Sequence, residues 1–323
     1  MKRSWMVAVA LGIVTLAGGT ILLMRAFTPV SFVEYRMSEP QDAPIAIAAG
    51  QNGAIWFTID HADAIGRLRD GRIERLPTAT RNIEPLGLAV AVDGSAWFTD
   101  IATRSIAHIT GAGEIARFVL DTPIVRLGRL AIARDGAVWF ADATDYGITR
   151  LKDGEFARHR VDTSRGGPYG VASTADGSVW ATLQYGNQLL RIAADGTDAT
   201  FDLPHPGAVP TDIAAGRDGS VWFLQFRANR VGQFKDGRFS DVEAGPENAG
   251  LSGIAVAPND DVWFGMLRRG SLGRLRNGRM DVIALPRANA RPYSVAVDRD
   301  GNVWYADISG TVGMLPAKQA GAR

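Results

Sequence analysis

The chain has no cysteine, and this absence removes several classes of protein at once. Without thiols there are no disulfides, no thiolate metal centre, no cysteine nucleophile and no lipid-modified cysteine. An excess of charge is lacking too, because 35 basic residues stand against 34 acidic ones and no run of five like charges occurs. Nothing in this balance favours nucleic acid, and we expect no nucleic-acid partner. After Arg25, no segment shows helical periodicity over a useful length.

The longest hydrophobic run lies at the amino terminus. Lys2 and Arg3 precede the uncharged stretch from Trp5 to Met24, which is long enough to cross a hydrocarbon core of about 30 Å as a helix. Positive charge before the span places the rest of the chain outside the cytoplasm. We therefore expect residues 1–27 to form a cytoplasmic tip and a transmembrane helix that anchors the protein in the inner membrane. Cleavage near residues 17–19, as in a signal peptide, is the alternative, and it would give a secreted protein. Under either alternative the rest of the chain lies outside the cytoplasm, in the periplasm or at the cell surface.

A repeat of 41 or 42 residues fills the rest of the chain. Its most regular feature is a tryptophan in a short apolar segment, found at Trp56, Trp97, Trp139, Trp180, Trp222, Trp263 and Trp304. Each unit reads as four short apolar strands separated by Asp-Gly or Asn-Gly pairs, which favour tight hairpin turns. Four antiparallel strands per unit, repeated without helices, are typical of a β-propeller. We expect residues 28–323 to form an all-β, seven-bladed propeller in which each tryptophan packs between neighbouring blades.

The last repeat lacks its fourth strand, and this predicts how the ring closes. The chain has a third strand at Thr311–Leu315 and then a charged tail. The segment Ser31–Arg36 precedes the first complete unit and resembles the fourth strands of the other units. We expect this leading segment to supply the outer strand of the last blade, which also covers an open sheet edge.

Three pieces of the repeat resemble the virginiamycin B lyase (streptogramin lyase) family. They are the segments 85–89 (Pro-Leu-Gly-Leu-Ala), 93–99 (Asp-Gly-Ser-Ala-Trp-Phe-Thr) and 65–68 (Ile-Gly-Arg-Leu). The resemblance covers about residues 30 to 316. It implies a seven-bladed propeller that opens a cyclic depsipeptide at its ester by elimination, with a histidine base and a magnesium ion at one mouth of the channel.

The sequence departs from the family where that chemistry is expected. The family's Glu-Pro-His-Gly motif at the start of the last blade is replaced by a segment with Arg291 for glutamate and Tyr293 for histidine. Ser252 stands in place of the histidine of the preceding blade, and Asp307 stands about where a glutamate would align. We therefore carry over the fold and not the catalytic residues, and the catalytic residues stay unknown.

Polar residues that enter first strands or leave second strands are expected to share one face around the channel. Convergent polar groups at a concave mouth predict a ligand site. The expected ligand-binding residues are Glu84, Arg126, Arg129, Tyr169, Asp212, Gln184, Gln225, Arg268, Arg291 and Tyr293. Thr211, Asp60 and His61 belong to the same face.

Several of these residues have two interpretations. Asp100, Asp142 and Asp307, each three residues past a tryptophan, either cap the following loop or hold a divalent cation, magnesium or calcium, in the channel. Arg126, Arg129 and Arg291 either bind a carboxylate or phosphate of a ligand or neutralise those aspartates. His61 is the one histidine of four expected near the mouth, as a surface residue or a base.

Two functions stay open. The first is a binding propeller that holds a small molecule, peptide or protein at the channel mouth. The second is a lyase or lactonase that uses a different residue set, with a metal held by Asp100, Asp142 and Asp307.

Overall fold

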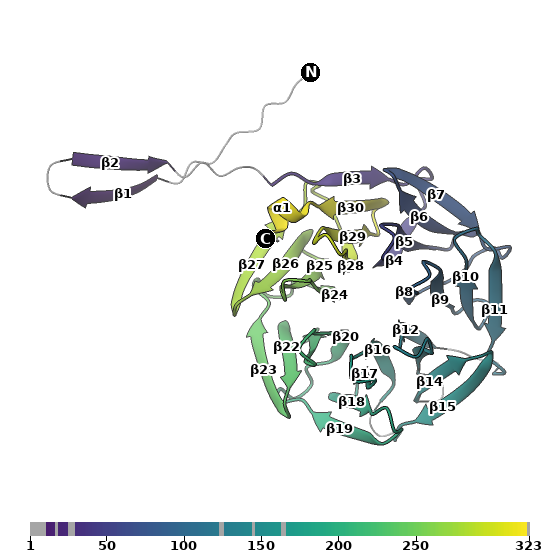
Figure 1. The fold of residues 1–323 in the computed structure, drawn as a ribbon. Coiled ribbons are helices and arrows are strands. Elements are labelled where there is room, and N and C mark those ends of the chain that lie inside the picture. The colour runs from purple at the N-terminus through teal and green to yellow at the C-terminus, as the bar shows by residue number, and fades with distance from the viewer. Residues whose placement is uncertain are drawn as a thin grey trace.

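The computed structural model describes residues 11–16, 19–24, 30–122, 126–143, 146–162 and 166–321. Seven four-stranded antiparallel sheets form a ring around a central channel (Figure 1). The all-β seven-bladed propeller expected from the repeat is confirmed. Numbering the blades along the chain, the strands of blades 1 to 3 are β4 (Ala43–Ala49), β5 (Ile55–Asp60), β6 (Ala64–Arg69), β7 (Arg72–Pro77), β8 (Leu88–Val90), β9 (Ala96–Asp100), β10 (Ser105–Ile109), β11 (Ile115–Val119), β12 (Leu127–Ile132), β13 (Val138–Asp142), β14 (Gly147–Lys152) and β15 (Glu155–Arg160).

Blades 4 to 7 repeat the same order, from the channel outward. Their strands are β16 (Pro168–Ser173), β17 (Val179–Leu183), β18 (Gln188–Ile192), β19 (Asp198–Asp202), β20 (Pro210–Ala215), β21 (Val221–Gln225), β22 (Arg230–Lys235), β23 (Arg238–Glu243), β24 (Leu251–Val256), β25 (Val262–Met266), β26 (Ser271–Arg276), β27 (Arg279–Ala284), β28 (Pro292–Val297), β29 (Val303–Asp307), β30 (Thr311–Leu315) and β3 (Val33–Arg36). The first strand of each blade lies nearest the centre of the ring (Figure 1).

The leading strand closes the ring as expected. β3 pairs antiparallel with β30, with Val33 opposite Met314 and Arg36 opposite Thr311. A short helix, α1 (Ala317–Ala320), follows β30. The carbonyl oxygen of Ala320 accepts hydrogen bonds from Arg274 and Arg276 of blade 6. Both ends of the propeller are thus fastened beside blade 7.

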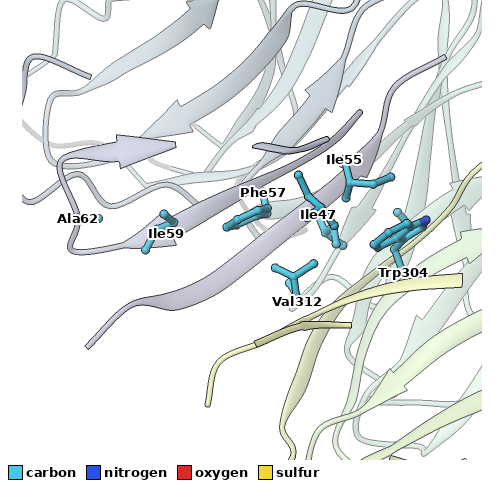
Figure 2. Close-up of a cluster of buried hydrophobic side chains, with 10 residues drawn as sticks. Ile47, Ile55, Phe57, Ile59, Ala62, Trp304 and Val312 are labelled. Atoms are coloured by element: carbon cyan, nitrogen blue, oxygen red, sulfur yellow. The ribbon is translucent and has the colours of Figure 1, made fainter. Parts of the chain in front are cut away.

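The core consists of apolar clusters between neighbouring blades. Between blades 7 and 1, Trp304 packs with Ile47, Ile55 and Phe57 of the first blade (Figure 2). Its ring also stacks on Tyr35 of β3, with the centroids 6.3 Å apart. This position confirms that the tryptophan of a repeat fills the gap between two sheets, where a large flat ring buries much apolar area.

Irregular pairing at the start of the first strands sets the direction of the channel-side residues. In β12 the register shifts between Leu127 and Leu130, and in β20 it shifts between Pro210 and Ile213. A bulge of this kind redirects the side chains of the unpaired residues. In these two blades the redirected residues include Arg129 and Asp212.

The expected transmembrane helix is not supported. Within the expected span, Leu11–Leu16 (β1) and Gly19–Met24 (β2) pair as two antiparallel strands, with Leu11 opposite Met24. Residues 1–10, 17–18 and 25–27 of this segment lie outside the described residues. β-Branched residues such as Ile13, Val14 and Ile21 suit paired strands. Among the described residues, no helix has the length and apolar character needed to cross a bilayer.

Candidate functional site

Arg129 and Asp212 form an ion pair inside the channel. They occupy equivalent positions in the first strands of blades 3 and 5. Arg129 precedes Leu130, which pairs with Phe140, and Asp212 precedes Ile213, which pairs with Phe223. The Nε and Nη2 atoms of Arg129 donate to the two carboxylate oxygens of Asp212 at 2.9 and 3.1 Å. The Nη1 atom donates to the carbonyl oxygen of Leu86 in blade 2, at 2.7 Å. A forked pair of this kind fixes both side chains in one geometry.

Two tyrosines enclose this arginine. The guanidinium carbon of Arg129 lies 6.0 Å from the ring centroid of Tyr169 and 5.5 Å from that of Tyr293. Burial alone would lower the pKa of Arg129, but the carboxylate of Asp212 keeps that pKa above its ordinary value. Burial raises the pKa of the Tyr169 phenol, which therefore stays protonated at neutral pH. We call Arg129, Asp212, Tyr169 and Tyr293 the channel plug.

The four plug residues line one side of a cavity of about 320 Å³, which we call the aromatic pocket. Apart from the plug, its walls are mostly apolar or aromatic. They comprise Gln184, Tyr185, Val209, Thr211, Phe226, Leu251, Ser252 and Leu267, with Gly250 and Gly253. Tyr185 is 83% exposed and Phe226 is 41% exposed. Two aromatic side chains of such exposure beside one cavity are available to a ligand.

The backbone at the edge of the aromatic pocket is unusual at Val209. Its φ angle is 55°, in the left-handed region that β-branched residues rarely adopt. The carbonyl oxygen of Val209 accepts a hydrogen bond from the amide of Phe226 at 3.1 Å, which ties this turn to the opposite loop. Such strain persists where the surrounding structure fixes the backbone, and it is concentrated at functional sites.

A second cavity of about 500 Å³ adjoins the first at Tyr293, which lines both; we call it the acidic pocket. Its apolar walls come from blades 1, 2 and 7. They comprise Ala43, Ile45, Pro85, Leu86, Ile101 and Ile308. Asp60, His61 and Glu84 supply the remaining polar groups, and the His61 Nε2 atom lies 3.7 Å from a carboxylate oxygen of Asp60. The structure thus brings Glu84, His61 and Asp60 together, away from the aromatic pocket's walls.

Asp100 and Asp307 hold the loops that follow their strands. Asp100 accepts hydrogen bonds from the amide of Glu84, from the Thr103 hydroxyl and from Arg117. Asp307 accepts them from the amide of Arg291, from Ser309 and from Arg287. Both carboxylates are fully buried. Of the two interpretations left open, loop capping is the one these contacts support.

The structure does not bring Asp100, Asp142 and Asp307 together. No group of three or more histidine, aspartate or glutamate side chains gathers in a metal-binding arrangement within the described ranges. The magnesium ion that the family resemblance implies would need Asp307, whose two oxygens already accept hydrogen bonds from Arg287 and Ser309. These residues do not fit a metal at that position, and we derive no chemical step through one.

The remaining predicted residues lie at the rim or below it. Arg126, Arg268 and Arg291 are exposed. The guanidinium of Arg268 lies 5.8 Å from the ring centroid of Phe226, beside the aromatic pocket. Gln225 is buried at the end of β21 and does not line either pocket. Arg268 also donates to the side-chain oxygen of Asn248, and none of the three arginines is among the described residues that line the two pockets.

Comparison with known proteins identifies the family. The model of the virginiamycin B lyase family matches residues 23–131 and 73–320. The chain belongs to this family. A virginiamycin B lyase of Nocardia farcinica is 32% identical over 216 residues, which are 67% of this chain and 75% of that protein. A virginiamycin B lyase of Bordetella parapertussis is 50% identical over 48 residues, which are 15% of this chain and 16% of that protein.

Solved structures agree with the fold. A streptogramin B lyase structure superposes with a TM-score of 0.84 at 26% identity and covers 88% of this chain and 96% of that one. A catalytically inactive histidine-to-alanine variant of the virginiamycin B lyase from Staphylococcus aureus, with quinupristin, gives a TM-score of 0.83 at 24% identity. That match covers 88% of this chain and 98% of the other, and at this identity it shows the fold alone.

Two of the residues at which the sequence departs from the family resemblance, Ser252 and Tyr293, line the aromatic pocket, whereas Arg291 and Asp307 line neither pocket. Tyr293 lines both pockets, and its ring lies against the guanidinium of Arg129. The hydroxyl of Ser252 donates to the carbonyl oxygen of Pro292 in the next blade at 2.7 Å. Ser252 therefore joins two blades, in the way that the Thr182 hydroxyl bonds the Thr211 carbonyl oxygen at 2.6 Å.

Sequence reasoning missed the apolar walls of the aromatic pocket. Tyr185 and Phe226 directly follow Gln184 and Gln225, both of which were predicted at the mouth. The prediction considered polar residues only, so their apolar neighbours were passed over. An aromatic residue in a polar loop after a second strand was the available signal.

Proposed function

We propose that this member of the virginiamycin B lyase family is a binding propeller, which holds a small molecule or peptide at the mouth of its channel. The observation that carries the proposal is an aromatic-walled pocket that the channel plug lines on one side. The plug's one arginine and one aspartate neutralise each other. A concave site with apolar walls and few fixed polar groups is typical of small-molecule binding.

The residues around the pocket also support binding over inherited catalysis. No histidine is among the described residues that line the aromatic pocket. Ser252 and Tyr293 stand at the family's histidine positions, and the protonated phenol of Tyr169 is no base at neutral pH. The inactive variant of the Staphylococcus aureus enzyme lost a histidine.

A second candidate is a lyase or lactonase that acts on a cyclic ester with a different residue set. Family membership favours it, and so does the presence of His61 beside Asp60 in the acidic pocket. A histidine with a neighbouring carboxylate is a common general base. Opening of a cyclic ester by the protein, lost on His61→Ala, would make this candidate the better one.

The binding proposal is tested with quinupristin as a probe, by isothermal titration of the full-length protein. Phe226→Arg places a charge at the aromatic pocket, and Val282→Arg makes the same change at a residue of similar exposure, 45% against 41%, on the outer strand β27. We expect the first variant to weaken binding by about tenfold or more, which is at least 1.4 kcal/mol. The control should bind like the wild type. Equal binding by both variants, or no binding by the wild type, would contradict the proposal.

We further propose that the protein is exported and tethered to the cytoplasmic membrane. Lys2, Arg3 and the uncharged stretch that follows support this inference. Fusing a periplasm-dependent reporter after Arg323 tests export, and membrane fractionation separates a tethered protein from a secreted one. Reporter activity confined to the cytoplasm would refute it.

A further inference from the structure

The acidic pocket has charge of one sign only. Among the described residues that line it, Asp60 and Glu84 are the formally charged groups, and none is a lysine or arginine. Its floor is apolar, with Ile45, Ile101 and Ile308. A positively charged group that carries an apolar body would meet both features, whereas a carboxylate would face repulsion there.

The surroundings of this pocket strengthen the same field. An adjoining hollow of about 710 Å³ shares Asp60 and His61 with it and is also lined by Glu39, Asp42, Asp63, Arg75 and Arg81. Arg75 is held by Asp42 and Asp63. Burial raises the pKa of Asp42, against the effect of Arg75. Counting Glu84, five carboxylates stand against two arginines across the two hollows, which focuses negative potential at this edge of the mouth.

The aromatic pocket favours a different ligand group from the acidic pocket. Because Arg129 and Asp212 are paired with each other, neither is left to balance a ligand charge. A cationic group placed among Phe226, Leu251 and Leu267 would lose hydration without gaining a counter-ion, and Arg268 beside Phe226 would repel it. An uncharged aromatic or branched apolar group fits these walls and would gain contact area on Phe226 and Tyr185.

Tyr293 connects the two pockets, because its side chain is a wall of both. We propose that the ligand of the mouth is an amine with an aromatic group, whose ring enters the aromatic pocket and whose ammonium lies between Asp60 and Glu84. This inference rests on the proposed binding function and adds the ligand's chemical class. It assigns Asp60 and Glu84 as the residues that determine specificity for a cation.

A matched series of three compounds tests the proposal by isothermal titration of the full-length protein. Phenylbutylamine, phenylbutanol and phenylbutyrate share the ring and the chain and differ in charge. We expect the amine to bind about tenfold more tightly than the alcohol, and the acid to bind most weakly. In the double variant Asp60→Asn, Glu84→Gln, the amine should lose this advantage while the alcohol binds as before. Asp70→Asn, at an exposed turn on the periphery, is the matched control and should change nothing.

The possible outcomes distinguish a wrong ligand class from a wrong binding function. Equal binding of amine and alcohol, both weakened by Phe226→Ser, would overturn the inference and leave the mouth as a binding site. Binding of quinupristin without any binding of the three compounds would have the same meaning. Binding of the amine that Phe226→Ser does not weaken would place the site elsewhere, and would contradict both the inference and the proposed function.

Discussion

The carboxylate of Glu34 accepts a hydrogen bond from the phenol of Tyr305 at 2.9 Å, although 271 positions separate the two residues. The same oxygen of Glu34 accepts from the Nε atom of Arg287 at 3.0 Å, and Arg287 in turn bonds Asp307. Burial raises the pKa of the Tyr305 phenol, and the neighbouring Glu34 carboxylate adds to that rise. One network therefore joins the closing strand β3 to the carboxylate that holds the loop at the channel mouth.

Removing Glu34 should weaken ring closure. In Glu34→Ala, Tyr305 loses its acceptor and Arg287 loses one of its three acceptors in a largely buried setting. We expect a loss of about 2–3 kcal/mol in the free energy of unfolding. Urea denaturation followed by tryptophan fluorescence measures it. Arg36→Ala, an exposed residue of the same strand, is the control and should cost little. Equal effects of the two changes would show that the network does not stabilise the closure.

Removing one partner of the Arg129–Asp212 ion pair should destabilise the fold more than replacing both partners with apolar residues. Asp212→Ala leaves a buried guanidinium without its counter-ion, and we expect a loss of about 3–5 kcal/mol. The double variant Arg129→Met, Asp212→Leu removes both charges and should recover much of that loss. The free energy of unfolding of the three proteins tests this. A double variant as unstable as Asp212→Ala would contradict the argument.

Glycines opposite the second-strand aromatics should resist even a methyl group. A Cβ atom on Gly273 would lie 2.2 Å from the ring of Phe264, its cross-strand partner. Gly273→Ala must displace that buried ring, and we expect a loss of about 1–3 kcal/mol. At Gly111 the nearest atom to a new Cβ is 3.9 Å away, on Arg67. Gly111→Ala should therefore change stability by less than about 0.5 kcal/mol.

Aspartates in the hairpin turns should make the stability of the blades sensitive to acid. Hydrogen bonds from Lys235 and Ser220 lower the pKa of Asp218 to about 2. At Asp176 burial opposes this effect, but bonds from Thr174 and Ser178 outweigh it and also lower the pKa to about 2. A carboxyl group whose pKa is lower in the folded protein stabilises the fold above its unfolded pKa of about 3.9.

That contribution is lost as pH falls from about 4 to about 2, since the protonated groups no longer accept these bonds. Urea titrations across this range should show falling stability, with a shallower fall in Asp218→Asn. The same slope in the variant and the wild type would refute the assignment to this turn. Above pH 5 these groups should contribute no pH dependence to the free energy of unfolding.

The fold could be predicted because each blade repeats the same pattern of short apolar strands, tight turns and a tryptophan. The spacing of the tryptophans fixed the number of sheets, and the missing outer strand after Leu315 indicated how β3 closes the ring. The channel plug could not be predicted in the same way. Arg129 and Asp212 stand where the other blades have Ala46, Gly87, Gly170, Gly253 and Ser294, but their pairing depends on bulges and on the curvature of the ring.

The amino-terminal expectation had a different weakness. Hydrophobic length alone predicted a helix between Trp5 and Met24, whereas β1 and β2 are strands. A run of apolar residues does not distinguish the two conformations by itself, and its β-branched residues are compatible with pairing.

The central claim is that the channel mouth binds its ligand without opening a cyclic ester. The most direct measurement is reversed-phase chromatography of quinupristin after incubation with the protein and magnesium. Chromatography is needed because elimination gives a linear isomer of unchanged mass. We predict that quinupristin is recovered intact at every protein concentration at which it binds. A linear product that increases with protein and disappears in His61→Ala would contradict the claim.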